Sequence, residues 1–139
     1  MRTNRISKLL SANDTGDTGG HQAGILVPKD PEILSFFPKL DARNQNPRSL
    51  LQFMDESGKF WEFAFIYYNN RLFGGTRNEY RLTRMTKYLR EAGLVPGDEV
   101  ILSRDDRDRY LVAYSRKTQA ARTATGALKL GSGWRIVQF

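Results

Sequence analysis

The chain has 139 residues, which is enough for one domain with its own hydrophobic core and leaves little room for a second. Lysine and arginine number 22 against 15 aspartates and glutamates, so the net charge of +7 favours a polyanionic partner such as nucleic acid. The absence of cysteine excludes disulfides and thiolate metal sites, and the single histidine leaves zinc without enough preferred ligands. We therefore expect a single domain over residues 1–139.

The N-terminal residues 1–10 are basic and do not resemble a signal peptide, because no continuous apolar segment follows the charged positions. No apolar run in the chain approaches the length needed to span a membrane. We expect a cytoplasmic protein that makes no membrane contact.

The first elements are two short apolar runs, 6–10 and 23–28, which we expect to form strands of an irregular hairpin around the loop 11–22. Asn13, Asp14 and the glycines of this loop favour turns with defined backbone angles. The loop is therefore predicted to be shaped and to project from a sheet edge. Asp30-Pro31 then starts a short helix that Pro38 ends, and its apolar residues are expected to plug the mouth of a barrel.

The clearest hairpin joins strands 49–55 and 59–68 across the turn Glu56-Ser57-Gly58. In the second strand, every odd position from 61 to 67 is aromatic, which is the alternation that a buried sheet face requires. We therefore assign these rings to the core and not to base stacking.

A second turn-rich loop at 69–78 and a short strand at 79–83 follow. Residues 71–90 hold five arginines and one lysine against one acid, Glu79, which is a local excess of +5. A helix is expected from Thr83 or Arg84 to Ala92, with Gly93 at its end, and further strands at 94–102, 109–114 and 134–139. This pattern predicts a mainly β fold, a seven-stranded open pseudobarrel with two short helices.

Three segments carry a family resemblance: Phe60 to Tyr67 with the pattern W-x-F, Tyr80 to Thr83 with Y-x-L-T, and Leu94 to Val100 with L-x-x-G-D-x-V. In this order they resemble the plant B-three DNA-binding pseudobarrel. The stretch from Ser11 to Gly24, SANDTGDTGGHQAG, resembles more specifically the effector DNA-binding domain of EcoRII-type restriction endonucleases.

The resemblance implies two arms that clasp the DNA major groove: an N-terminal arm at 11–22 and a C-terminal arm between Tyr68 and Arg81. It further implies that the chain binds double-stranded DNA without cutting it, as the target-recognition domain of a prokaryotic type II restriction enzyme. The nuclease domain would then lie elsewhere in a parent protein, and the site would be a short pseudo-palindrome such as CCWGG.

The residue types of both arms match the hydrogen-bonding groups of the major groove, where arginine pairs with guanine, a carboxylate with cytosine, and an amide with adenine. The expected base readers are Asn13, Asp14, His21, Gln22, Arg77, Asn78 and Glu79. The expected backbone contacts are Arg5, Lys8, Lys29, Arg71, Thr76, Arg81, Arg84 and Lys87. Glu79 has two equal interpretations, a cytosine contact or a residue that holds an arginine in place, and Asn13 and Asp14 can instead close a structural turn.

Catalytic interpretations have less support. The glycine-rich stretch 16–24 lacks the Gly-Lys-Ser/Thr of a phosphate loop and precedes a strand where such a loop precedes a helix. Asp55, Glu56 and Lys59 have residue types found in metal-dependent nucleases, but they occupy a tight turn, and two-metal hydrolysis needs several converging carboxylates. We expect no catalytic residue, no bound metal and no cofactor. A stand-alone transcription regulator and, with less support, a nuclease in its own right are the alternatives.

Overall fold

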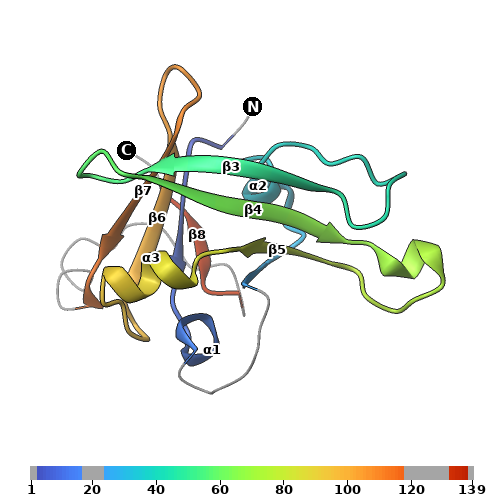
Figure 1. Cartoon of the computed structure of the whole chain (residues 1–139), viewed down its shortest axis with the longest axis horizontal. Helices are drawn as coiled ribbons and strands as arrows, with labels where there is room; N and C mark the ends of the chain where they lie inside the picture. The colour runs from blue at the N-terminus through green and yellow to red at the C-terminus, as the bar shows by residue number, and fades with distance from the viewer. Residues whose placement is uncertain (1–2, 17–23, 118–131, 138–139) are drawn as a thin grey trace.

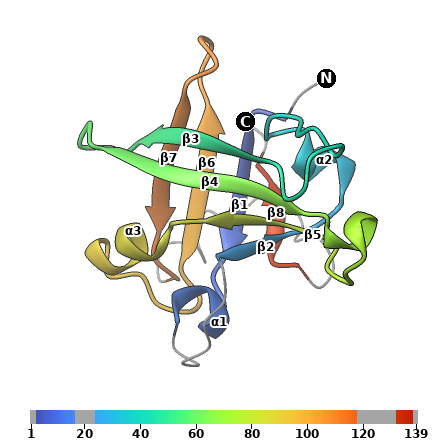
Figure 2. The same cartoon turned by 45° about the vertical axis from the view of Figure 1, so that its right-hand side comes forward.

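The computed structural model describes residues 3–16, 24–117 and 132–137, which form one curled sheet (Figures 1 and 2). The strand order is β2-β5-β4-β3-β7-β6-β1-β8, and every pairing is antiparallel except the parallel pairing of β3 with β7. The strands are β1 Arg5–Leu9, β2 Ile25–Val27, β3 Arg48–Met54, β4 Phe60–Tyr68, β5 Glu79–Thr83, β6 Glu99–Arg104, β7 Tyr110–Ser115 and β8 Trp134–Ile136. The predicted mainly β pseudobarrel is confirmed, with eight strands in the described residues where seven were expected.

The two edges of the open sheet, β2 and β8, are joined by a side chain. The indole Nε1 of Trp134 donates a hydrogen bond to the carbonyl oxygen of Leu26 at 2.9 Å, and Trp134 is 1% exposed. Trp134 of β8 therefore has two roles. Its ring is buried in the core, and its N–H links the two sheet edges, which no backbone hydrogen bond joins in the described residues.

The predicted hairpin between 6–10 and 23–28 is wrong. β1 pairs with β6 on one side and with β8 on the other, so it has no free edge for β2. β2 pairs instead with β5. The loop between them therefore connects two strands that are not neighbours in the strand order.

The described residues contain three short α-helices, α1 Ala12–Thr15, α2 Pro31–Leu34 and α3 Thr86–Glu91, and a 3-10 turn, η1 Asn70–Phe73. Two helices were expected, and they correspond to α2 and α3. The expected start of the second helix at Thr83 or Arg84 was too early, because Arg84 has a φ of +66° and leaves the helical region. α1 and η1 were not expected, because each is a single turn inside an arm.

The core lies between the inner face of the sheet and α2. Phe63 and Phe65 of β4 are buried, and Phe37, just after α2, stacks on Phe65 with ring centroids 4.2 Å apart. Ile33 and Phe36 are fully buried at the same end of the barrel. α2 and the residues after it thus close the barrel mouth, as the sequence predicted.

The turn between β3 and β4 is held by one carboxylate. Asp55 Oδ1 accepts hydrogen bonds from the Ser57 and Lys59 backbone N–H groups and from the Ser57 hydroxyl, at 2.6–3.0 Å. Asp55 Oδ2 accepts from the Trp61 indole at 2.9 Å. These bonds, chiefly those from the Ser57 and Trp61 side chains, lower the pKa of Asp55 from 3.8 to about 2.

Asp55 should make the stability of the domain fall in acid. A carboxyl whose pKa is lower in the folded state stabilises the fold above its unfolded pKa, and this contribution is lost as the pH falls through the folded value. We expect urea titrations to show the free energy of unfolding dropping from about pH 4 to about pH 2. The drop should be shallower in Asp55→Asn, which does not titrate; equal drops in the two proteins would contradict this assignment.

Candidate nucleic-acid interface

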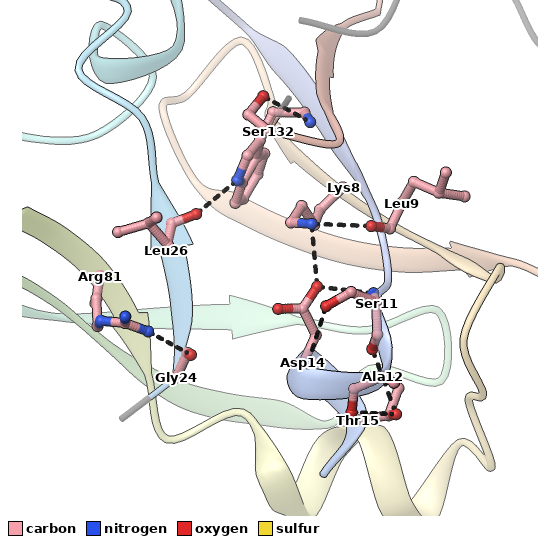
Figure 3. Close-up of polar contacts among 11 residues, drawn as sticks. Lys8, Leu9, Ser11, Ala12, Asp14, Thr15, Gly24, Leu26, Arg81 and Ser132 are labelled. Atoms are coloured by element: carbon pink, nitrogen blue, oxygen red, sulfur yellow. Dashed lines mark hydrogen bonds and ion pairs between the residues drawn. The ribbon is translucent and has the colours of Figure 1, made fainter. Parts of the chain in front are cut away.

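The described part of the N-terminal arm begins with the turn α1, which a capping box fixes (Figure 3). The Ser11 hydroxyl accepts from the Asp14 backbone N–H at 3.2 Å, and Asp14 Oδ2 accepts from the Ser11 backbone N–H at 2.9 Å. Gly16 ends the turn in the left-handed conformation, with φ at +82°. The base of this arm is therefore an ordered turn.

Lys8 and Asp14 form an ion pair at the base of the same arm, with Nζ 3.0 Å from Oδ2 and side chains that are 9% and 10% exposed. The Lys8 ammonium also donates to the Leu9 carbonyl oxygen at 2.9 Å. A backbone contact was predicted for Lys8 and a base contact for Asp14. The structure shows both side chains enclosed and paired with each other, while Asn13 beside them is exposed. His21 and Gln22 lie outside the described residues.

The C-terminal arm is tied down by Asn69, which is fully buried. Its Oδ1 accepts from the Asn46 backbone N–H at 2.7 Å, and its Nδ2 donates to the carbonyl oxygens of Ala42 and Asn44 at 3.1 and 2.8 Å. Across the arm, the Arg71 backbone N–H donates to the Arg77 carbonyl oxygen at 3.0 Å. The arm is thus a closed loop supported by the segment 42–46.

Ion pairs link two predicted readers of the C-terminal arm, Arg77 and Glu79, to the predicted backbone contact Arg81. Arg77 Nε lies 2.6 Å from Glu79 Oε1, and Arg81 Nη2 lies 3.2 Å from Glu79 Oε2. The Arg77 guanidinium also lies 3.7 Å from the centre of the Tyr68 ring. Of the two interpretations of Glu79, these ion pairs fit the one in which the carboxylate holds arginines in place. The neighbouring Asn78 uses its Oδ1 to accept from the Tyr67 hydroxyl at 2.7 Å.

Glu79 is ionised in this setting. Partial burial opposes its ionisation, but the hydrogen bonds and positive charges of Arg77 and Arg81 outweigh burial and lower the pKa of Glu79. The carboxylate therefore balances part of the positive charge between the arms.

Arg81 links these ion pairs to the segment that follows the N-terminal arm. Its Nη1 donates to the Gly24 carbonyl oxygen at 3.2 Å (Figure 3). Gly24 has a φ of +79°, and a Cβ on it would lie 2.2 Å from the Leu82 carbonyl oxygen, so only glycine fits. Ile25 then pairs with Leu82 and Val27 with Tyr80. The two arms consequently join opposite ends of one short β2–β5 ladder.

The other predicted backbone contacts divide into two groups. Lys29, Arg71, Thr76, Arg84 and Lys87 are exposed, although Arg84 pairs with Glu62 at 2.8 Å. Arg5 is half-buried at the end of β1 opposite to the N-terminal arm, and burial lowers its pKa. The structure therefore brings Arg77, Asn78, Glu79 and Arg81 together, and it separates Arg5 from them.

Sequence reasoning missed the residues that support the arms. Tyr67 was assigned to the core stripe, but it is half-buried and bonds to Asn78, and Tyr68 lies under Arg77. The one available signal was the aromatic pair at the end of β4, directly before the arm. Asn69 has no such signal, because its three partners are set by tertiary structure.

The described residues show no group of three or more His, Asp or Glu side chains that could hold a metal ion. Over the same ranges, no helix has the length and apolar character needed to cross a membrane.

A protein family described as "Restriction endonuclease EcoRII, N-terminal" matches residues 2–96. The type II restriction enzyme EcoRII of Escherichia coli is 46% identical over 80 residues, which cover 55% of this chain and 20% of that enzyme. Auxin response factor 22 of rice is 29% identical over 129 residues, or 93% of this chain and 17% of that protein. The chain thus corresponds to about a fifth of the length of these relatives.

Among solved structures, the chain is similar to the protein in the Arabidopsis FUS3–DNA complex. The TM-score is 0.62 at 19% identity, and the match covers 79% of this chain and 94% of the other. At this identity the likeness concerns the fold.

Proposed function

Because the chain belongs to the family of EcoRII N-terminal domains, we propose that it binds double-stranded DNA through its two arms, in the major groove. The observation that carries the proposal is the chain of contacts from Arg77 through Glu79 and Arg81 to Gly24. It fixes donors on the C-terminal arm relative to Gly24, the residue that leads from the N-terminal arm into β2, in a protein of net charge +7.

Arg77 is the best-placed reader of a base. Its Nε is held by Glu79 and its plane lies on Tyr68, which leaves the two terminal nitrogens of the fork for the O6 and N7 acceptors of a guanine. The Asn78 amide nitrogen can donate a hydrogen bond to an adenine, and the side-chain amide of the exposed Asn13 can also contact an adenine. His21 and Gln22 remain proposed readers on the N-terminal arm.

Asp14 and Glu79 fit a positioning role better than a cytosine contact. The carboxylate of each is already engaged, Asp14 with Lys8 and Glu79 with two arginines. Phosphate contacts fit the exposed members of the predicted set, which are Lys29, Arg71, Thr76, Arg84 and Lys87.

The parent activity that we propose is target recognition for a prokaryotic type II restriction enzyme, with catalysis in another domain and CCWGG as the candidate site. The identity to EcoRII supports this assignment. A transcription regulator is the second candidate, because the rice and Arabidopsis relatives include an auxin response factor and B3 domain transcription factors.

A selection from randomised duplexes tests DNA recognition and the site together. We expect enrichment of one short motif, and CCWGG if the restriction assignment holds. An enriched motif of another sequence would remove CCWGG and keep sequence-specific binding. Equal recovery of all sequences would contradict specific recognition, and cleavage of plasmid with magnesium would contradict a purely binding role.

Arg77→Ala and Lys87→Ala should have different effects on specificity. Loss of Arg77 should cost about 1–3 kcal/mol on the preferred duplex and relax one base position, because a bidentate guanine contact is lost. Loss of Lys87, exposed on α3, should weaken all sequences alike. Titrations with the preferred duplex and with duplexes changed at each position measure both. Equal losses by Arg77→Ala on preferred and scrambled duplexes would remove Arg77 from the readers.

A further inference from the structure

A pocket of about 400 Å³ is lined by residues of the β3–β4 turn, the start of β4, α3 and β7. The β3–β4 turn and α3 lie toward the end of β4 that is farthest from the C-terminal arm (Figure 1). No residue proposed for DNA recognition lines it. Its walls are aromatic and small apolar side chains, and its rim is acidic. The lining residues used below are Asp55, Glu56, Lys59, Trp61, Tyr88, Glu91 and Tyr114.

Two aromatic rings form a corner of the pocket. Trp61 and Tyr88 have ring centroids 5.3 Å apart with planes at 82°. The Lys59 ammonium lies 4.2 Å from the centre of the Trp61 ring and 3.0 Å from Glu91 Oε2. An aromatic face with a carboxylate beside it is the arrangement that binds ammonium groups. The pocket thus already holds one alkylammonium group, on a side chain that is 50% exposed.

Tyr88 presents an unused hydroxyl to the pocket. The residue is 3% exposed, and its hydroxyl has no hydrogen-bond partner in the described part of the chain. Burial first, and then the charges of Asp55, Tyr114 and Glu56, raise the pKa of Tyr88. Tyr88 and those three residues all line the pocket. The Tyr88 hydroxyl oxygen can accept a hydrogen bond from a donor that enters the pocket.

The charge of the pocket selects a cation. Asp55, Glu56 and Glu91 face one cation of the lining, Lys59, in a protein that is otherwise strongly basic. Arg116 lies nearby, 5.0 Å from the centre of the Tyr114 ring, but its charge is balanced by Asp98, which lies outside the pocket lining and 4.0 Å from Nη1, and its guanidinium donates to the carbonyl oxygens of Ala92 and Gly93. The acidic surplus is therefore left for a ligand.

We propose that this pocket binds an alkylammonium group, either of a free polyamine or of a lysine side chain on a partner protein. The group would displace Lys59 from Trp61, pair with Glu91 and donate a hydrogen bond to the Tyr88 hydroxyl oxygen. The contacts come from Lys59 in the β3–β4 turn, Trp61 near the start of β4, and Tyr88 and Glu91 of α3, and none of these residues lies in either arm.

The indole N–H signal of Trp61 in a ¹⁵N–¹H spectrum of the full chain reports on the site, and that of Trp134, which bonds to Leu26, is the internal reference. The two probes are spermidine and a peptide that contains one lysine and has both of its termini blocked. A saturable shift of Trp61 alone is expected; a response to spermidine only identifies a free polyamine, and a response to the peptide identifies a side-chain ligand. No saturable shift with either probe overturns the proposal.

Three variants of the pocket and one control outside it separate this site from general attraction of cations. Glu91→Gln should weaken binding about tenfold and Tyr88→Phe several-fold, because each removes one polar partner of the ammonium. Lys59→Gln should strengthen binding, because it removes the internal competitor. Asp106→Asn removes the same charge as Glu91→Gln at an exposed turn outside the pocket and should change nothing. Equal weakening by Asp106→Asn and Glu91→Gln would overturn the site.

Discussion

Raising the salt concentration from about 50 to 200 mM should weaken binding to the preferred duplex by roughly 10²–10³-fold, as expected for about four to six neutralised phosphates. The physical reason is the release of counterions from DNA when cations of the protein take their place. The structure supplies such cations at Lys29, Arg71, Arg84 and Lys87, which are all exposed. Lys8 is excluded from this number, because its charge is enclosed with Asp14.

Titrations at several salt concentrations give the slope of log affinity against log salt, and single variants calibrate it. Arg71→Ala should reduce the slope by about one, because one phosphate contact is lost. Lys39→Ala is the matched control, since Lys39 is exposed beside α2 and lies in neither arm. A flat salt response in the unchanged chain would contradict DNA binding through these cations.

Gly24→Ala should lower the free energy of unfolding by about 3 kcal/mol or more, through backbone strain and overpacking together. The new Cβ would lie 2.2 Å from the Leu82 carbonyl oxygen and 2.7 Å from the Thr83 Cα, both backbone atoms that cannot rotate away. Relief requires β2 to move from β5. The bond from Arg81 to the Gly24 carbonyl oxygen would then weaken, so DNA affinity should fall as well.

Gly16→Ala is the control for this change. Gly16 also has a positive φ, +82°, but nothing lies within 4 Å of its Cβ position. Gly16→Ala should therefore lower the free energy of unfolding only through backbone strain, by about 1–2 kcal/mol. Urea titrations of the two variants give the difference. Equal losses would show that the clash at Gly24 is relieved at no cost, and would contradict the close packing of β2 on β5.

The elements that the sequence predicted well are those with local causes. The β3–β4 hairpin follows from a three-residue turn and a period-2 aromatic stripe, and α2 from a capping residue with proline. The partners of β1 could not be found in this way, because Leu9 pairs with Glu99, far along the chain. The local sequence pattern favoured pairing of β1 with the next strand, β2. In the structure, β6 and β8 occupy the two edges of β1 instead.

The candidate interface shows the same division. The turn-rich arms and their excess of positive charge are visible in the sequence, and so is the Ser11-x-x-Asp14 spacing of a capping box, which could have predicted α1. The role of Glu79 could not be decided in this way, because the sequence gives no distance between its carboxylate and Arg81. The readers on the N-terminal arm, His21 and Gln22, stay predictions.

The β2–β5 ladder has a consequence for the length of the DNA site. From Glu79, where the C-terminal arm ends, to Leu82, which pairs with Ile25 at the start of β2, β5 advances about 10 Å, which is close to three base-pair steps of DNA. Since one arm joins each end of this segment, we expect its length to set the number of base pairs between the two proposed sets of readers. Relatives with a longer or shorter ladder should therefore recognise sites of correspondingly different length.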